Sequence, residues 1–111
     1  MKELKLAIRA AKIAGNIVKE HFVEPRVSVK GVKDVVTTAD VEAEKSVKEF
    51  LLEKTDYGFL GEETGEKDGN PVWIVDPLDG TRPFCFGIPN FSTVIALMNG
   101  GDTLLGVVYN P

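Results

Sequence analysis

The sequence contains one cysteine, Cys85, among 111 residues, which excludes an intrachain disulfide. It also lacks any apolar stretch that approaches the roughly 20 residues needed to cross a bilayer. The N-terminus has no signal-peptide core, because Met1, Lys2 and Glu3 open an amphipathic pattern instead. We therefore expect a cytoplasmic protein without a membrane partner, in which the cysteine packs as a small hydrophobe.

Positive charge is also scarce. The formal net charge is −4 and the isoelectric point is near 5.0. No cluster of lysine and arginine interleaved with aromatic residues offsets this balance, which disfavours a nucleic-acid backbone as the partner. An anionic ligand would need metal ions to hold it.

The length sets a ceiling of one domain, so residues 1–111 are expected to form a single domain. Apolar residues recur at helical spacing in two segments, which predicts two amphipathic helices, the second beginning at Thr37 or Thr38. Residues 26–36 between them alternate apolar and polar positions and are expected to be extended. The predicted buried stripes are Leu4, Ala7, Ile8, Ala11, Ala14, Ile17, Val18 and Phe22 in the first helix, and Ala39, Ala43, Val47, Phe50 and Leu51 in the second.

Strands are expected after these helices. Short apolar runs cover residues 57–60 and 72–75, and the polar residues 64–71 between them are predicted to form a flexible loop. Residues 91–98 and 103–109 flank Asn-Gly-Gly-Asp, which is typical of a β-hairpin. Two helices followed by strands predict an α+β fold, with both helices on one face of a mainly antiparallel sheet.

Asp76 and Asp79 stand where the apolar run 72–75 is expected to end. Pro77 fixes one backbone angle between them, so a turn can aim both carboxylates and the Leu78 carbonyl into one small volume. Ligands that are all oxygen favour Mg²⁺ over zinc. The alternative is an ordinary surface turn, since Asp, Pro and Gly are common turn residues.

The two residues that follow, Gly80 and Thr81, suit a phosphate. Glycine lets the backbone approach a ligand closely, and Thr81 can cap a short helix whose free N–H groups face an anion. A second acidic pair, Glu62 and Glu63, follows the apolar run 57–61 as Asp76 follows its own run. Two strand ends that each carry carboxylates can converge, although a solvated acidic loop is the plain alternative.

Three motifs together resemble the first half of the inositol monophosphatase-type phosphatases. They are residues 34–40 (Asp-Val-Val-Thr-Thr-Ala-Asp), residues 61–63 (Gly-Glu-Glu), and residues 73–81 followed by Phe84, Gly87 and Pro89. The resemblance runs from about Lys30 to Tyr109. It implies a Mg²⁺-dependent, lithium-sensitive phosphomonoesterase with two or three metal ions, and half of the layered α/β sandwich of the sugar and inositol phosphatase fold.

The resemblance also implies roles for single residues. Glu62, Asp76 and the Leu78 carbonyl would hold one metal, and Asp76 and Asp79 would share a second. Glu63 would support these ligands or bind a further metal.

The remaining roles concern the reaction itself. Thr81 and Asp40 would orient and deprotonate the attacking water, and the amides of Gly80 and Thr81 would bind the phosphate. Without the resemblance, Asp40 reads as a carboxylate favoured by the dipole at the start of a helix.

The sequence departs from the family pattern in two ways. Arg82 and Pro83 replace the usual residues after Gly-Thr, and the C-terminal half of the family, with a further metal-binding aspartate, has no counterpart. The chain therefore looks truncated, and we expect a homodimer or association with the missing half to cover its exposed sheet.

Two kinds of function follow from this reading. One is hydrolysis of a small phosphate monoester, with inositol monophosphate as the default substrate and fructose bisphosphate, histidinol phosphate or adenosine bisphosphate as those of relatives. The other is an inert half-domain that acts as an assembly or metal-binding module.

Overall fold

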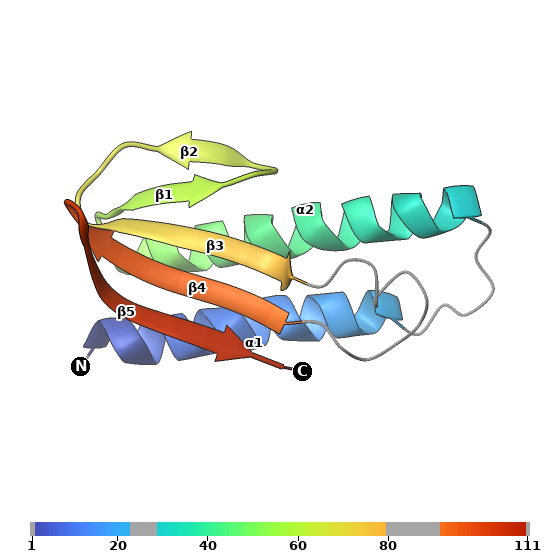
Figure 1. Cartoon of the computed structure of the whole chain (residues 1–111), viewed down its shortest axis with the longest axis horizontal. Coiled ribbons are helices and arrows are strands. Elements are labelled where there is room, and N and C mark those ends of the chain that lie inside the picture. Colours follow the sequence, from blue (N-terminus) through green and yellow to red (C-terminus); the bar gives the residue numbers. More distant parts are fainter. Residues whose placement is uncertain (1, 23–28, 80–91, 111) are drawn as a thin grey trace.

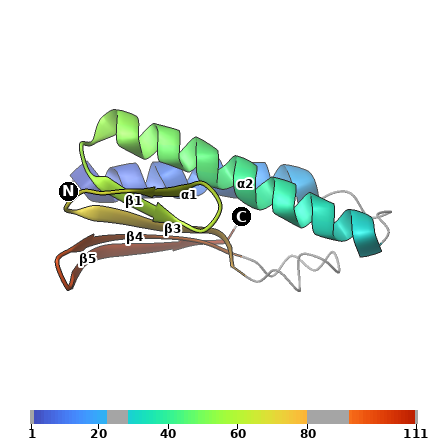
Figure 2. The ribbon, with the colours of Figure 1, turned by 90° about the horizontal axis from the view of Figure 1, so that it is seen from above.

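The computed structural model of the chain describes residues 2–22, 29–79 and 92–110, and describes residues 21–22, 29–37 and 77–79 by their backbone alone. Two helices lie against one face of a five-stranded sheet (Figures 1 and 2). The predicted α+β arrangement is confirmed. The elements are α1 (Lys2–Phe22), α2 (Val29–Lys54), β1 (Gly58–Gly61), β2 (Gly65–Lys67), β3 (Val72–Asp79), β4 (Ser92–Asn99) and β5 (Asp102–Tyr109).

The sheet has the strand order β2-β1-β3-β4-β5. Neighbouring strands are antiparallel except for β1 and β3, which run in the same direction (Figure 1). Leu60 of β1 is paired with Ile74 of β3. Because parallel strands end at the same edge of a sheet, the segments that follow these two residues emerge side by side.

The face of the sheet that meets the helices holds the largest buried side chains. Phe59, Trp73, Leu97 and Leu105 occupy one cross-strand row, and each is at most 9% exposed. The indole Nε1 of Trp73 donates a hydrogen bond of 3.1 Å to Oγ1 of Thr55. The ring therefore buries its apolar body without leaving its N–H group unsatisfied.

The first helix packs through small residues. Leu4 and Ile8 were predicted to be buried, but they are 38% and 39% exposed. A helix rich in alanine can approach its neighbours closely, so α1 turns its alanines toward α2 and the sheet and leaves larger residues at the edge. Its buried hydrophobic residues are Leu6, Ala7, Ala10, Ala11, Ala14 and Val18. In the described ranges, neither helix has the length and apolarity to cross a membrane.

The second helix begins earlier than expected, at Val29 rather than at Thr37 or Thr38. The alternation of residues 26–36 suggested extended backbone, but each residue added to an existing helix gains a hydrogen bond without a new nucleation cost. Propagation from the downstream helix can therefore override a weak local pattern. Four predicted core residues of this helix are fully buried, and Phe50 is partly buried. The four are Ala39, Ala43, Val47 and Leu51.

Each of the two hairpins has a glycine with left-handed backbone in or next to its turn. The turn of the β4–β5 hairpin falls at the predicted position, and Gly100 has φ of 63° there. In the segment 64–71, by contrast, the flexible-loop prediction was wrong, because β2 forms within it and pairs with β1. Gly65 opens this short strand with φ of 82°, a conformation that glycine adopts without a steric cost.

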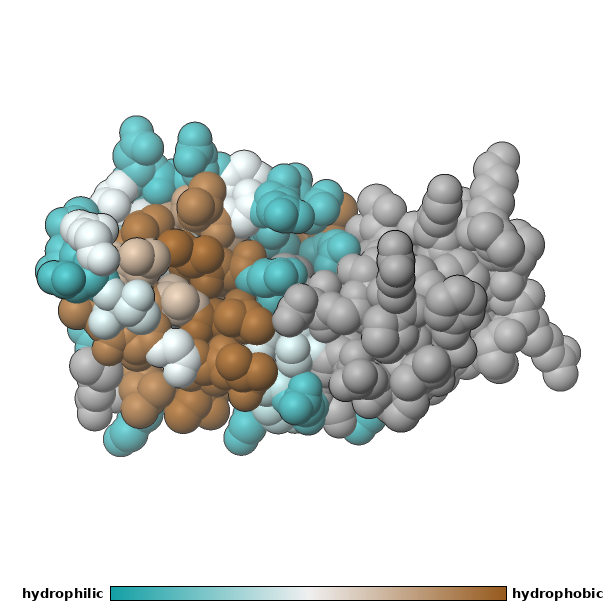
Figure 3. All heavy atoms as spheres, in the orientation of Figure 1, coloured by the Kyte–Doolittle hydropathy of each residue, from teal (hydrophilic) through white to brown (hydrophobic). Residues whose placement is uncertain are grey.

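The face of the sheet remote from the helices is also apolar (Figure 3). Leu60, Leu104 and Val108 are 45%, 44% and 68% exposed on the strands β1 and β5. Half-buried apolar residues of β3 and β4, including Ile74 and Val94, lie between them in the strand order. Contiguous apolar surface of this kind marks a place where another surface packs.

Candidate functional site

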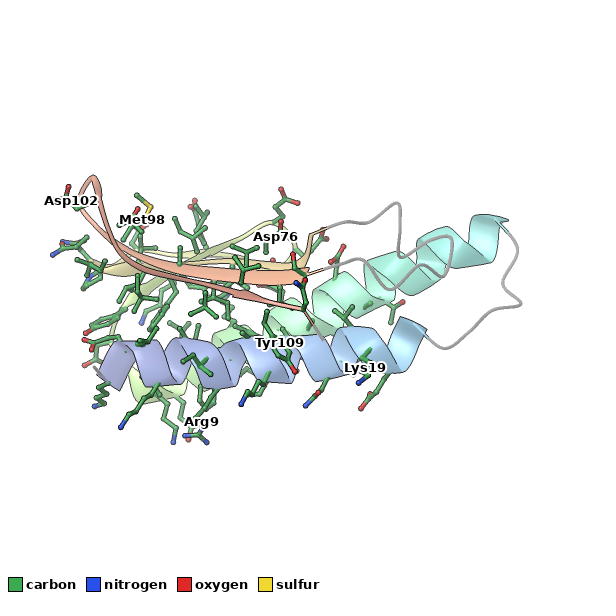
Figure 4. The ribbon with its side chains drawn as sticks, turned by 60° about the horizontal axis from the view of Figure 1, so that its bottom comes forward. Arg9, Lys19, Asp76, Met98, Asp102 and Tyr109 are labelled. Carbon is green, nitrogen blue, oxygen red and sulfur yellow. The ribbon has the colours of Figure 1, made fainter. Side chains whose placement is uncertain are left out.

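The parallel pair of β1 and β3 brings two predicted ligand positions to the same end of the sheet. Leu60 is paired with Ile74, and Glu62 and Asp76 each follow that pair by two residues. Both are exposed. Asp76 lies at the end of the sheet opposite Asp102 in the β4–β5 hairpin (Figure 4).

The strand β3 continues past the expected end at Val75 and reaches Asp79. Asp76 is paired with Val94 and Asp79 with Ser92, and the register shifts between them. Such an irregularity lets a proline sit within a strand, and it redirects neighbouring side chains. The expected turn at residues 76–79 is therefore an irregular stretch of strand.

Asp40 lies on α2, half-buried and surrounded by other carboxylates. Burial, followed by the negative charges of Glu63, Asp76, Glu44 and Glu62, raises its pKa from an ordinary value of 3.8 to about 7. These residues come from α2, the segment after β1, and β3. The fold thus gathers acidic groups that are distant in sequence into one electrostatic neighbourhood.

Glu44 is a residue of this neighbourhood that the sequence reasoning missed. Its side chain is fully buried, one helical turn after Asp40. Oε2 accepts hydrogen bonds from the backbone N–H of Glu63 at 3.0 Å, from the backbone N–H of Thr64, and from the Thr64 hydroxyl at 2.7 Å. The signal in the sequence was the spacing of four, which places two carboxylates on one helix face.

Lys48, one further turn along α2, also binds the segment after β1. Its Nζ donates a hydrogen bond of 2.9 Å to the carbonyl of Thr64, and it lies 5.5 Å from the centre of the Phe59 ring. The N–H, hydroxyl and carbonyl groups of Thr64 are therefore all bound by α2. The residues after β1 are fixed to the helix that carries Asp40.

Several predicted residues cannot be placed in the same way. The side chains of Leu78 and Asp79, and the whole of Gly80 and Thr81, lie outside what the structure describes. Among the described residues, no group of three or more aspartate, glutamate, histidine or cysteine side chains is arranged to hold a metal. The predicted roles of Glu62, Asp76 and their partners stay predictions.

The donor chemistry of this region fits a hard cation. Every predicted ligand is an oxygen, and hard cations such as Mg²⁺ prefer oxygen ligands. The raised pKa of Asp40 reflects its burial first and the negative charges of the neighbouring carboxylates second. A divalent cation beside these carboxylates would offset that repulsion.

Comparison with known proteins identifies the class. The chain matches the model of the inositol monophosphatase family over residues 2–111 and belongs to that family. It is 45% identical to an inositol-1-monophosphatase of Caulobacter vibrioides, over 94% of this chain and 44% of the relative. It is 41% identical to the Nus factor SuhB of Haemophilus influenzae, over 97% of this chain and 43% of the relative.

A solved structure supports the same assignment. The extragenic suppressor protein SuhB from Bartonella henselae superposes with a TM-score of 0.85 at 36% identity, over 99% of this chain and 44% of that one. The chain thus spans less than half the length of these relatives. The fold described above is shared with the superposed structure.

Proposed function

We propose that this chain supplies the acidic part of an active site that hydrolyses a small phosphate monoester with the help of Mg²⁺. The observation that carries the proposal is the gathering of Glu62, Glu63 and Asp76 around a half-buried Asp40. Family membership supports it, because relatives are named inositol-1-monophosphatases. Inositol monophosphate is therefore the default substrate.

Each residue has a defined task in this proposal. Glu62, Asp76, Asp79 and the carbonyl of Leu78 hold the metal ions, two or three in number. The bound ions supply positive charge that polarises the phosphate and lowers the pKa of water. Glu63 lies beside these ligands or binds a further ion.

The proton transfer falls to Asp40 and Thr81. Asp40 is half-buried on α2 within the electrostatic reach of Glu62 and Asp76, and it serves as the general base. The Thr81 hydroxyl orients a water molecule, and a carboxylate oxygen of Asp40 takes its proton as the water oxygen bonds to phosphorus. The ester P–O bond breaks, and the leaving oxygen takes a proton from solvent water, so that the alcohol is released. The backbone amides of Gly80 and Thr81 hold the phosphate oxygens.

Release of phosphate tests the proposal. The chain is incubated with Mg²⁺ and a panel of monoesters that includes inositol monophosphate, fructose bisphosphate, histidinol phosphate and adenosine bisphosphate. Because Asp79→Asn removes one ligand charge, it should lower Mg²⁺-dependent release by about tenfold or more and weaken Mg²⁺ binding in calorimetry. Equal release by both proteins at the level of the buffer would show that the chain alone is inert.

The second candidate is an inert half-domain that serves assembly or weak metal binding. Two observations favour it: the chain spans 43% to 44% of its relatives, and one face of its sheet is apolar and exposed. A homodimer, or a complex with the C-terminal half that relatives possess, would cover that face. Light scattering after size-exclusion chromatography decides this point, and a clean monomer would count against self-association. The cytoplasmic location predicted from the sequence stays a prediction.

A further inference from the structure

The segment after β1 carries two of the proposed site residues, Glu62 and Glu63, yet both side chains are exposed. An exposed turn is ordinarily mobile, whereas ligand positions must be held closely to bind a metal well. Something in the fold must therefore hold the backbone of this turn. The contacts of α2 show which side chain does so.

Glu44 is the centre of these contacts. One oxygen of its carboxylate, Oε2, accepts three hydrogen bonds, from the N–H groups of Glu63 and Thr64 and from the hydroxyl of Thr64. The side chain is fully buried, and the three bonds to it are partly buried. Hydrogen bonds to an ionised carboxylate in such surroundings are roughly twice as strong as neutral ones.

Gly61 is fitted to this carboxylate. A Cβ at that position would lie 2.5 Å from Oε1 and 2.8 Å from Oε2 of Glu44, far inside contact distance. The end of a glutamate side chain can usually move aside, but this one is buried and bound by three donors. The last residue of β1 therefore has to be a glycine as long as Glu44 keeps its place.

We infer that Glu44 is a positioning residue, which fixes the turn of residues 62–64 so that Glu62 and Glu63 face the metal site. The inference rests on the proposed function and names a residue that the proposal itself does not use. Lys48 assists by binding the Thr64 carbonyl from the same helix. In this inference Glu44 acts through the backbone of the turn, which its Oε2 binds.

Glu44→Met tests the inference, because methionine keeps the volume and loses the acceptor. Exchange of the Glu63 and Thr64 amides with deuterated water should accelerate by about tenfold or more, as their acceptor is gone. The affinity for Mg²⁺ alone, measured by calorimetry, should fall by about 10- to 100-fold, the usual loss when a supporting partner of a metal ligand is removed. Glu44→Gln retains one acceptor oxygen and should recover part of both losses.

Two further variants separate positioning from plain stability. Glu49→Gln makes the same chemical change as Glu44→Gln on an exposed position of α2, and it should alter neither measurement. Gly61→Ala should destabilise the chain that has Glu44 and should be tolerated in Glu44→Ala, since the clash is with the end of the glutamate side chain. Mg²⁺ affinity should stay low in the double variant.

The outcomes are distinct. Faster exchange with unchanged Mg²⁺ affinity would overturn the inference, because Glu44 would then serve folding alone. Unchanged exchange in Glu44→Met would overturn it as well. If the unaltered chain binds no Mg²⁺, the proposed function fails, while the exchange data still decide whether Glu44 holds the turn.

Discussion

The helix α2 borders two regions of opposite character. One of its faces places Ala39, Ala43, Val47 and Leu51 in the core, where apolar side chains are fully buried. The adjacent face carries Asp40 and Glu44 into a neighbourhood of carboxylates that repel one another. Apolar burial stabilises the first region. In the second region, burial and the repulsion between neighbouring carboxylates make the ionised form of Asp40 unfavourable. Such a contrast on one helix is typical of a stable scaffold that carries a functional site.

The largest expected effect lies in the apolar region. Trp73→Ala should lower the free energy of unfolding by about 3–5 kcal/mol, because it removes a fully buried ring and leaves a cavity. Val108→Ala, on the face remote from the helices, should change it by less than about 0.5 kcal/mol. Urea unfolding, monitored by circular dichroism, measures both free energies. Equal losses would contradict the expectation that only the face toward the helices contributes strongly to stability.

An intermediate effect is expected at the acidic end. Mg²⁺ at about ten times its dissociation constant should stabilise the chain by about 1.4 kcal/mol if it binds only the folded state. Asp76→Asn should abolish most of this gain, while Asp102→Asn, at the opposite end of the sheet (Figure 4), should retain it. Thermal unfolding with sodium chloride at matched ionic strength provides the measurement. An equal gain in stability in both variants would show that Mg²⁺ does not bind at Asp76 of β3.

The smallest effect concerns Asp40. Its pKa is about 7 in the folded chain and near 3.8 when unfolded, so the folded state binds more protons between these values. Stability from this group is therefore lost as the pH rises from about 4 to about 7.

Asp40→Asn should remove that dependence. Because the carboxyl is half-exposed and solvent screens it, the variant should be more stable than the unaltered chain by about 1 kcal/mol near pH 8. The two should be equal near pH 4. Denaturant titrations across this range test the sign, and a variant that is less stable at pH 8 would contradict the electrostatic account.

The core could be foreseen from the sequence better than the site could. Residues of α2 at spacings of four, such as Ala43 and Val47, predicted their own burial because helical periodicity is regular. The turn between β4 and β5 followed from glycines that tolerate left-handed backbone. Both signals are local, which is why they were sufficient.

The missed features depend on contacts between distant segments. The strand β2 has no buried residue, so its sequence has no apolar pattern that would predict a strand. It forms by backbone pairing with β1. Glu44 reads as an ordinary helix-surface glutamate until the turn at Thr64 packs over it. The convergence of Glu62 with Asp76 was predicted from strand ends, and the parallel pairing of β1 with β3 provides the geometry for it.

The strand order has a consequence for the time course of folding. Elements adjacent along the chain are mostly adjacent in the sheet, and the pairings of β1 with β2 and of β4 with β5 close short loops, which favours rapid folding. The bonds of Glu44 join α2 to the turn after β1 and form only once helix and sheet have docked. Glu44→Met should therefore accelerate unfolding and leave the refolding rate nearly unchanged in stopped-flow experiments. A slower refolding rate would instead place this turn in the folding nucleus.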